Sequence, residues 1–241
     1  MNNYNYQHFS TDDYDFDQFG GPKVGEKAPD FECTTTENRS KRILDFDGDF
    51  LVLELGSITC PLFQGRRAGM SSLHQLFPNV SSAILYVREA HPGIDIPSHR
   101  SFEEKQQRAQ MLKNDDGEER LILVDGLDGA AHKAYGGLPN AVYIINANGC
   151  VVYRSKWNNA NATKQALAAL TKGKAPDAKG YFLPASPAVV VKTLKRSGDG
   201  SLTDFLVGLP KLIWVNLIKR NLSLFLNRKP DTAANFADLT C

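Results

Sequence analysis

The stretch FLVLELGSITCP, residues 50–61, decides the fold that we expect for this chain. Its first six residues form a short apolar run ahead of Gly56, which is typical of a buried β-strand. After Pro61 the apolar residues recur at spacings of three and four through residues 70–77, which predicts a helix. Cys60 therefore lies where the carboxyl end of a buried strand meets the start of a helix.

The alternation of strand and helix continues downstream of this junction. The expected strands are residues 82–87, 121–124, 141–145 and 151–153, and the expected helices are residues 98–113, 128–135 and 161–170. A right-handed crossover unit followed by a β-β-α unit gives an α/β, thioredoxin-like fold. Its central mixed β-sheet carries helices on both faces, and a helical C-terminal extension follows.

Composition divides the chain into three zones. Residues 1–22 are rich in Asn, Tyr and Asp and contain no Lys or Arg, which predicts a flexible N-terminal arm. Residues 23–173 form the thioredoxin-like domain. Residues 174–241 form a basic, amphipathic C-terminal extension, in which Lys and Arg far outnumber Asp and Glu.

A helix is expected over residues 209–228 of this extension, with Pro210 near its start. Its wide apolar arc, opposite a face that carries Asn216, either packs on the core domain or lies on a membrane surface. Residues 203–229 are therefore a candidate for peripheral membrane contact, and a homodimer contact through the same arc stays open.

Charge and cysteine content bound the function class. The net charge of +1 and the lack of interleaved basic and aromatic residues indicate that nucleic acid is not a partner. The N-terminus lacks the pattern of a secretory signal, and no uninterrupted apolar run spans a bilayer. The four scattered cysteines contain no CxxC pair, which disfavours a disulfide framework and a zinc site. We therefore expect a cytoplasmic protein without a bound metal or cofactor.

The position of Cys60 predicts a reactive thiol. Unpaired N–H groups and the helix dipole at a helix N-terminus stabilise a thiolate and lower the thiol pKa. Pro61 suits the first helical turn, and Arg66 and Arg67 add positive potential. Pro139, just before strand 141–145, stands where thioredoxin-like folds place a cis-proline that faces the reactive cysteine. The alternatives are a buried structural cysteine and an ordinary loop proline.

Three segments in order, GSITCPLF (56–63), YVREAHPG (86–93) and PSHRSFEEK (97–105), resemble the iodothyronine deiodinase family. The resemblance covers roughly residues 45–172 and implies a thioredoxin fold and reductive removal of iodine, with thiol as the electron source. Residues 24–31 (VGEKAPDF) are also similar to the start of peroxiredoxin-like proteins, which supports the wider superfamily.

The resemblance assigns roles residue by residue. It places Cys60 at the selenocysteine position as the nucleophile, His91 and His99 as proton-handling residues, and Glu89 as the residue that orients a histidine. Ser57, Thr59, Pro61 and Pro139 would support this site. The sequence departs from the family at two points. Sulfur replaces selenium at residue 60, and the segment between His91 and His99 is shorter than in the vertebrate enzymes and lacks their tryptophan.

Three functions remain open from the sequence. The first is a deiodinase-like thiol oxidoreductase that acts on a halogenated or otherwise electrophilic small molecule and is regenerated by an external thiol such as thioredoxin or glutathione. The second is a single-cysteine peroxidase, for which Leu53 and Ser57 depart from the usual proline and threonine. The third is a non-enzymatic docking or regulatory module. Cys33 and Cys150 are the candidates for a resolving thiol.

Overall fold

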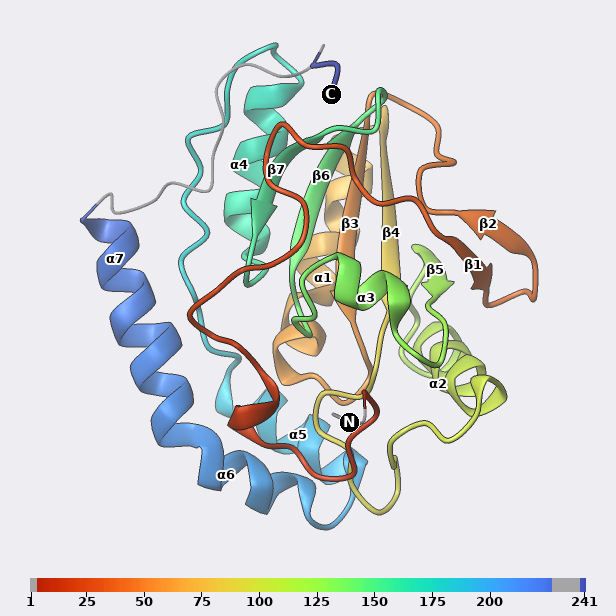
Figure 1. Ribbon diagram of the computed structural model, residues 1–241, viewed down its shortest axis with the longest axis vertical. Coiled ribbons are helices and arrows are strands. Elements are labelled where there is room, and N and C mark those ends of the chain that lie inside the picture. The colour runs from red at the N-terminus through yellow and green to blue at the C-terminus, as the bar shows by residue number, and fades with distance from the viewer. Residues whose placement is uncertain (1–3, 227–238) are drawn as a thin grey trace.

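The computed structural model describes residues 4–226 and 239–241 of the chain (Figure 1). A seven-stranded mixed sheet forms its centre, in the order β2-β1-β5-β4-β3-β6-β7. The strands are β1 (Glu32–Thr35), β2 (Ser40–Arg42), β3 (Phe50–Gly56), β4 (Val80–Tyr86), β5 (Leu121–Val124), β6 (Val142–Asn146) and β7 (Val151–Ser155). Strands β3, β4 and β5 are parallel, whereas β6 runs antiparallel to β3 and β1 antiparallel to β5.

This sheet confirms the predicted thioredoxin-like architecture. Strand β3 is central and fully buried, with Leu53 and Leu55 unexposed, as its apolar run predicts. The sequence missed β1 and β2, because these short edge strands are largely polar and only partly buried.

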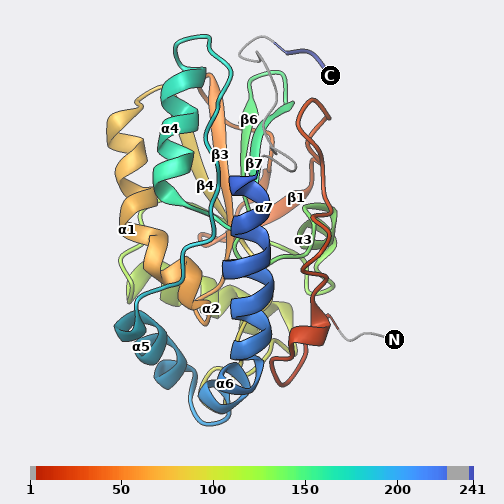
Figure 2. The same cartoon turned by 90° about the vertical axis from the view of Figure 1, so that its left-hand side faces the viewer.

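Helices cover both faces of the sheet (Figure 2). Helices α1 (Pro61–Leu76), α2 (Phe102–Asn114) and α4 (Ala160–Leu170) pack on one face, and α3 (Ala130–Ala134) lies on the other. Ser101 begins α2 as an N-cap, since its side chain accepts a hydrogen bond from the Glu104 N–H. Pro61 occupies the first turn of α1, as predicted.

The N-terminal segment packs along the sheet face that the short helix α3 leaves open (Figure 2). Its aromatic side chains are buried there: Tyr6, Phe9, Tyr14 and Phe16. The Arg88 guanidinium lies 4.5 Å from the centre of the Tyr6 ring and 4.9 Å from that of Tyr14. The predicted flexible arm is therefore wrong for residues 4–22, since aromatic burial and cation–π contacts fix it, and residues 1–3 lie outside the described part.

The C-terminal extension is helical, as predicted, but differs in its details. Helix α5 (Pro187–Ser197) precedes a continuous helix made of α6 (Ser201–Leu212), the π-helical stretch η2 (Ile213–Arg220) and α7 (Asn221–Phe225). Pro210 lies inside α6 rather than near the helix start. The last two residues of the expected helix, 227 and 228, lie outside the described residues.

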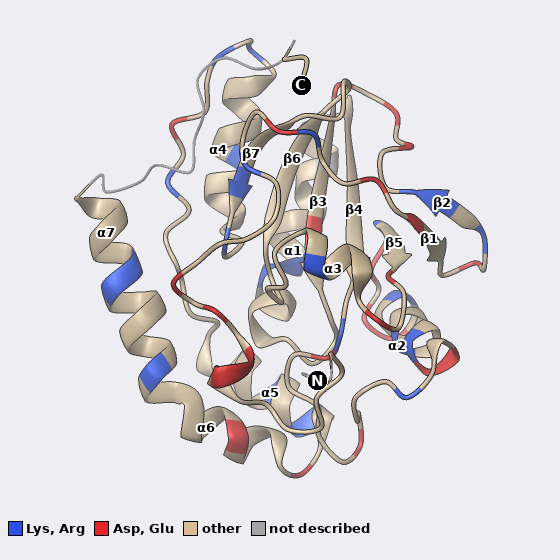
Figure 3. Ribbon diagram, in the orientation of Figure 1, with Lys and Arg blue, Asp and Glu red and all other residues tan. Residues whose placement is uncertain are grey.

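The long helix turns both polar and apolar residues toward the protein, among them Asn216, Leu212 and Leu224. Asn216 is 1% exposed, whereas Trp214 is 59% and Phe225 71% exposed. In Figure 3 the ribbon of the helix labelled α6 and α7 is mostly tan, so few of its residues are Lys, Arg, Asp or Glu. By length and composition Ser201–Phe225 is apolar enough to cross a membrane, and only 17% of its apolar window is buried inside the protein.

A disulfide joins Cys150 to Cys241 across 91 residues of sequence. The side-chain amides of Asn146 and Asn148 donate to the Leu239 carbonyl and hold the C-terminus beside Cys150. The sequence disfavours a disulfide framework and does not reveal this single bridge, which forms because the fold returns the C-terminus to the β6–β7 turn. Cys150 is thus engaged, and Cys33 lies in the core on the opposite sheet face from Cys60.

Candidate active site

Cys60 is the N-cap of helix α1 and is only 1% exposed. Burial raises the pKa of its thiol to about 12, while the backbone amides of Phe63 and Leu62 and the Arg66 guanidinium act in the opposite direction. The predicted placement at a helix N-terminus is confirmed. The predicted lowering of the thiol pKa is wrong, because desolvation exceeds the stabilisation that the helix start supplies.

A buried carboxylate ties the Cys60 loop to the two other motifs. Glu89 Oε2 accepts from the Thr59 amide at 3.2 Å and from Thr59 Oγ1 at 2.6 Å. Glu89 Oε1 accepts from Tyr86 Oη at 2.5 Å and from His99 Nε2 at 3.0 Å. Burial alone raises a carboxyl pKa, but the hydrogen bonds and the charge of His99 outweigh it and hold the pKa of Glu89 below its usual value.

Ser57 and Thr59 connect the same two loops through backbone hydrogen bonds. Ser57 Oγ accepts from the Ala90 amide, and Thr59 Oγ1 accepts from the His91 amide, each at 3.2 Å. Both side chains are unexposed, so the bonds are shielded from water. These contacts fix the position of residues 57–60 relative to His91.

His91 lies against two aromatic rings at the edge of a cavity. Its ring centre is 4.2 Å from that of Phe9 and 5.5 Å from that of Phe205. Burial lowers the pKa of His91 to about 3, so its imidazole is neutral at pH 7. Its Nδ1 atom is buried and has no hydrogen-bond partner.

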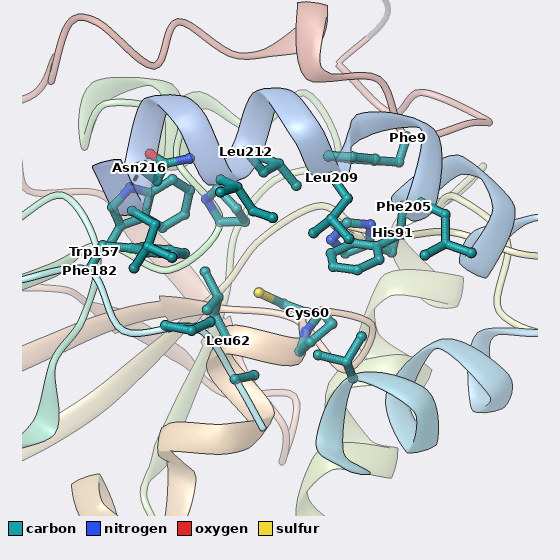
Figure 4. Close-up of a pocket in the computed structure, with 18 of the residues that line it drawn as sticks. Phe9, Cys60, Leu62, His91, Trp157, Phe182, Phe205, Leu209, Leu212 and Asn216 are labelled. Carbon is teal, nitrogen blue, oxygen red and sulfur yellow. Dashed lines mark hydrogen bonds between the residues drawn. The ribbon is translucent and has the colours of Figure 1, made fainter. Parts of the chain in front are cut away.

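Cys60 and His91 both line a partly open pocket of about 330 Å³ (Figure 4). The other lining side chains are apolar or aromatic except for one amide, and they include Phe9, Tyr14, Phe16, Leu62, Trp157, Phe182, Phe205, Leu209, Leu212 and Asn216. Glu89 and His99 do not line it. The structure therefore brings Cys60 and His91 to the cavity and places Glu89 and His99 in a buried hydrogen-bond network outside its lining.

Pro139 lines the same cavity as Cys60. No peptide bond within the described ranges is cis, so the bond that precedes Pro139 is trans. The predicted position of this proline is right, and its predicted cis geometry is wrong.

Two features of the site escape the sequence motifs. The first is the roof of the cavity, to which the C-terminal extension contributes Asn216 and the N-terminal segment contributes Phe9. The second is Glu54 in strand β3, which is unexposed and bonded to Arg120 at 2.8 Å and to Asn158 at 2.6 Å. The sequence does contain a signal for the buried Glu54, because a charged residue interrupts the apolar run 50–55.

A metal centre is not formed by residues 4–226 and 239–241, among which no three His, Cys, Asp or Glu side chains converge. A thioredoxin-like sheet with one cysteine at the start of α1, facing an apolar cavity, defines the class of thiol-based oxidoreductases. The chain belongs to the iodothyronine deiodinase family, since the model of that family matches residues 3–171.

Curated relatives support this membership. The chain is 30% identical over 142 residues to thyroxine 5-deiodinase of Gallus gallus, which covers 54% of this chain and 55% of that protein. It is 30% identical over 151 residues to the Homo sapiens thyroxine 5-deiodinase, covering 57% and 49%. The chain thus spans about half the length of the curated relatives that it matches.

Solved structures resemble the fold at low identity. A hypothetical protein from Sinorhizobium meliloti aligns with a TM-score of 0.53 at 17% identity, covering 68% of this chain and 92% of that chain. An uncharacterized conserved protein from Geobacillus kaustophilus aligns with a TM-score of 0.51 at 20% identity, covering 65% and 84%.

Proposed function

We propose that this protein is a thiol-dependent oxidoreductase that removes a halogen reductively from an aromatic substrate, with Cys60 as the nucleophile. The observation that carries the proposal is the Cys60 thiol at the wall of an aromatic-lined cavity that also holds His91 (Figure 4). Membership of the iodothyronine deiodinase family supports the chemistry. Aromatic side chains suit an aryl substrate, since rings pack in offset or edge-to-face contacts.

The first step balances as a thiol plus an aryl iodide giving a sulfenyl iodide plus the arene. Cys60 Sγ bonds to iodine while the carbon–iodine bond breaks, and the carbon keeps that electron pair and takes a proton. An external thiol then attacks Sγ, releases iodide and forms a mixed disulfide. A second thiol restores the Cys60 thiol and leaves as the disulfide, so two thiols are oxidised for each aryl iodide reduced.

The proton in this scheme comes from Cys60 itself. A thiol with a pKa of about 12 is protonated at neutral pH, so the S–H bond must break as the S–I bond forms. His91 lines the same pocket, and it would relay that proton to the carbon once hydration of the occupied site brings its pKa back toward the ordinary value. Glu89 and His99 hold the Cys60 and His91 loops in register through Thr59.

An external thiol is the reductant that we propose. Cys150 is occupied by its disulfide and Cys33 lies across the sheet from Cys60. Because Cys60 is 1% exposed, a small thiol such as glutathione reaches it with less rearrangement than a protein thiol such as thioredoxin.

We also propose that the outer face of Ser201–Phe225 contacts a membrane surface peripherally. Leu206, Trp214 and Phe225 are more than half exposed on this helix, which supports the proposal. Sedimentation with phospholipid vesicles tests it, with Trp214→Ser plus Phe225→Ser as the variant. Equal sedimentation of the variant and the unaltered protein would exclude the helix as the contact.

Iodide release tests the oxidoreductase proposal. The protein is incubated with 4-iodophenol and dithiothreitol at pH 7.5, and iodide is measured with Cys60→Ser and Cys33→Ser as matched variants. We expect release to disappear in Cys60→Ser and to persist in Cys33→Ser. Consumption of a hydroperoxide without iodide release would instead favour the single-cysteine peroxidase. If the protein catalyses neither reaction, the docking module is the remaining function.

A further inference from the structure

We propose that the C-terminal extension sets the substrate class of this site, and that the cavity takes an uncharged aryl halide whose hydrogen-bond acceptor binds Asn216. This inference rests on the proposed function and deepens it. It depends on three observations: where the roof of the cavity comes from, which polar atom of the roof lacks a partner, and which charges the lining contains.

Much of the roof comes from a part of the chain beyond the family match. That match ends at residue 171, whereas Phe205, Leu209 and Asn216 lie on the helix Ser201–Phe225 and partly cover the pocket over Cys60 (Figure 4). The nucleophile therefore comes from the family domain, and much of the surface that a substrate would touch comes from the extension. Selectivity for the substrate follows from this second surface.

Asn216 offers the cavity a hydrogen-bond donor of fixed orientation. Trp157 Nε1 donates to Asn216 Oδ1 at 2.8 Å, and because an indole N–H can only donate, the amide oxygen must face Trp157. Asn216 Nδ2 is then directed elsewhere, is buried and has no partner. An unpaired buried donor is unfavourable, and a ligand acceptor would relieve that cost.

The backbone around Asn216 has an unusual helical geometry. Asn216 lies in the π-helical stretch Ile213–Arg220, and such stretches are rare and frequently occur at functional sites. The extra residue in the turn rotates the helix face there. The only strongly polar side chain that this helix adds to the described lining is thereby placed in the cavity.

The lining contains no formal charge among the residues described. Its polar groups are the Cys60 thiol, the neutral imidazole of His91, the Tyr14 hydroxyl and the Asn216 amide. An ammonium or carboxylate group buried against this lining would lose its hydration without gaining an ion pair, which is strongly unfavourable. The cavity therefore selects against an aryl halide that carries a free amino-acid group.

Volume and arrangement narrow the ligand further. A cavity of about 330 Å³ lies at the small end of the range of about 300–1,000 Å³ for ligand pockets, which suits a compact aryl group. Figure 4 shows the Cys60 sulfur between the Asn216 end and the His91 end of the cavity. The substrate then presents its halogen to Cys60 and its acceptor to Asn216.

Binding without turnover tests the substrate class separately from the chemistry. The Cys60→Ser protein is titrated by calorimetry with 4-iodoanisole, with 1-ethyl-4-iodobenzene as the isostere that lacks the acceptor, and with 3-iodotyrosine as a charged probe. We expect 4-iodoanisole to bind on the order of 100-fold more tightly than 3-iodotyrosine. We expect it to bind about tenfold more tightly than its isostere.

Asn216 is tested in the same Cys60→Ser background. Asn216→Leu should weaken 4-iodoanisole about tenfold and leave 1-ethyl-4-iodobenzene within about twofold. Asn216→Asp keeps the acceptor for Trp157 and removes the donor, so it should weaken 4-iodoanisole as well. Asn161→Asp, an exposed position on α4, is the matched control and should change neither ligand.

Two results would overturn the inference: equal affinity for 3-iodotyrosine and 4-iodoanisole, or unchanged 4-iodoanisole affinity in folded Asn216→Asp. If Asn216→Leu loses its near-ultraviolet circular dichroism, the variant has lost its tertiary packing, and the affinity of Asn216→Asp for 4-iodoanisole then decides whether Asn216 binds the ligand. Selective binding without iodide release from the unaltered protein would refute the proposed chemistry and keep the substrate class. Iodide release together with equal affinity for 3-iodotyrosine and 4-iodoanisole would keep the proposed chemistry and refute the substrate class.

Discussion

The replacement of Glu89 by Gln gives the sharpest test of the buried network behind Cys60. Glu89 is 1% exposed, and its two carboxylate oxygens accept four hydrogen bonds from Thr59, Tyr86 and His99. Glutamine has the same shape but replaces one oxygen with an NH₂ group. An NH₂ group cannot accept, so the two hydrogen bonds received by whichever oxygen it replaces lose their charged acceptor, and the Thr59 amide can only donate.

The magnitude follows from those two bonds. A hydrogen bond to a charged group contributes about 1.5–3 kcal/mol, so Glu89→Gln should lower the free energy of unfolding by about 3–5 kcal/mol at pH 7. The pKa of Glu89 is held below its usual value, so the native carboxylate stabilises the fold above the unfolded pKa of about 4.3. The difference between the two proteins should shrink as the pH falls through the pKa of the folded state.

Urea unfolding at pH 7 and at pH 3 measures this difference. Glu119→Gln is the matched control, because Glu119 is exposed and its loss should change stability by less than about 0.5 kcal/mol. Equal midpoints for Glu89→Gln and the unaltered protein at pH 7 would refute the argument that the carboxylate holds the motif loops together.

Three further predictions concern the disulfide, the thiol and the imidazole. Cys241→Ser should lower the free energy of unfolding by about 4–5 kcal/mol from the entropy of the 91-residue loop, measured in urea, and a reductant should not destabilise this variant further. Alkylation of native Cys60, read by peptide mass spectrometry, should be slow at pH 8 and rise only toward pH 12, and fast reaction at pH 7 would contradict the raised pKa. Phe9→Ala should expose His91 and raise its pKa from about 3 toward 6.5 in an NMR titration, with an unmoved titration showing that Phe9 is not what excludes water.

The sequence predicts the core of the site because local patterns encode it. An apolar strand, a glycine and a Cys-Pro pair place Cys60 at the start of α1 by short-range rules. The three family motifs also identify Glu89 and His99, which the structure joins by a hydrogen bond. What these patterns do not contain is the solvent exposure of Cys60, and exposure determines the direction of its pKa shift.

Long-range partners explain the expectations that failed. The N-terminal segment has the composition of a disordered chain, yet its tyrosines find Arg88, a residue more than 70 positions away. The disulfide between Cys150 and Cys241 likewise depends on where the C-terminus returns. Periodicity and composition describe a segment alone, so contacts between distant segments leave no signature in either.

The helix Ser201–Phe225 shows the same limit most clearly. Its amphipathic pattern leaves open whether the apolar arc packs on the core or lies on a membrane, and the structure turns Asn216 inward, where it accepts a hydrogen bond from Trp157 Nε1. Ion pairs at Lys211–Asp12 and Lys219–Asp17 also join this helix to the N-terminal segment. Exposed pairs of this kind contribute only about 0–1 kcal/mol each.

The position of this helix matters for function because Cys60 is 1% exposed. The helix partly covers the pocket through which the proposed aryl halide and reducing thiol would approach the sulfur. The sheet and α1 are held by a buried core, whereas Phe225 and Trp214 on the roof helix face solvent. We therefore expect this helix to open more readily than the sheet. Opening would return water to Cys60 and His91, whose raised thiol pKa and lowered imidazole pKa both follow from burial.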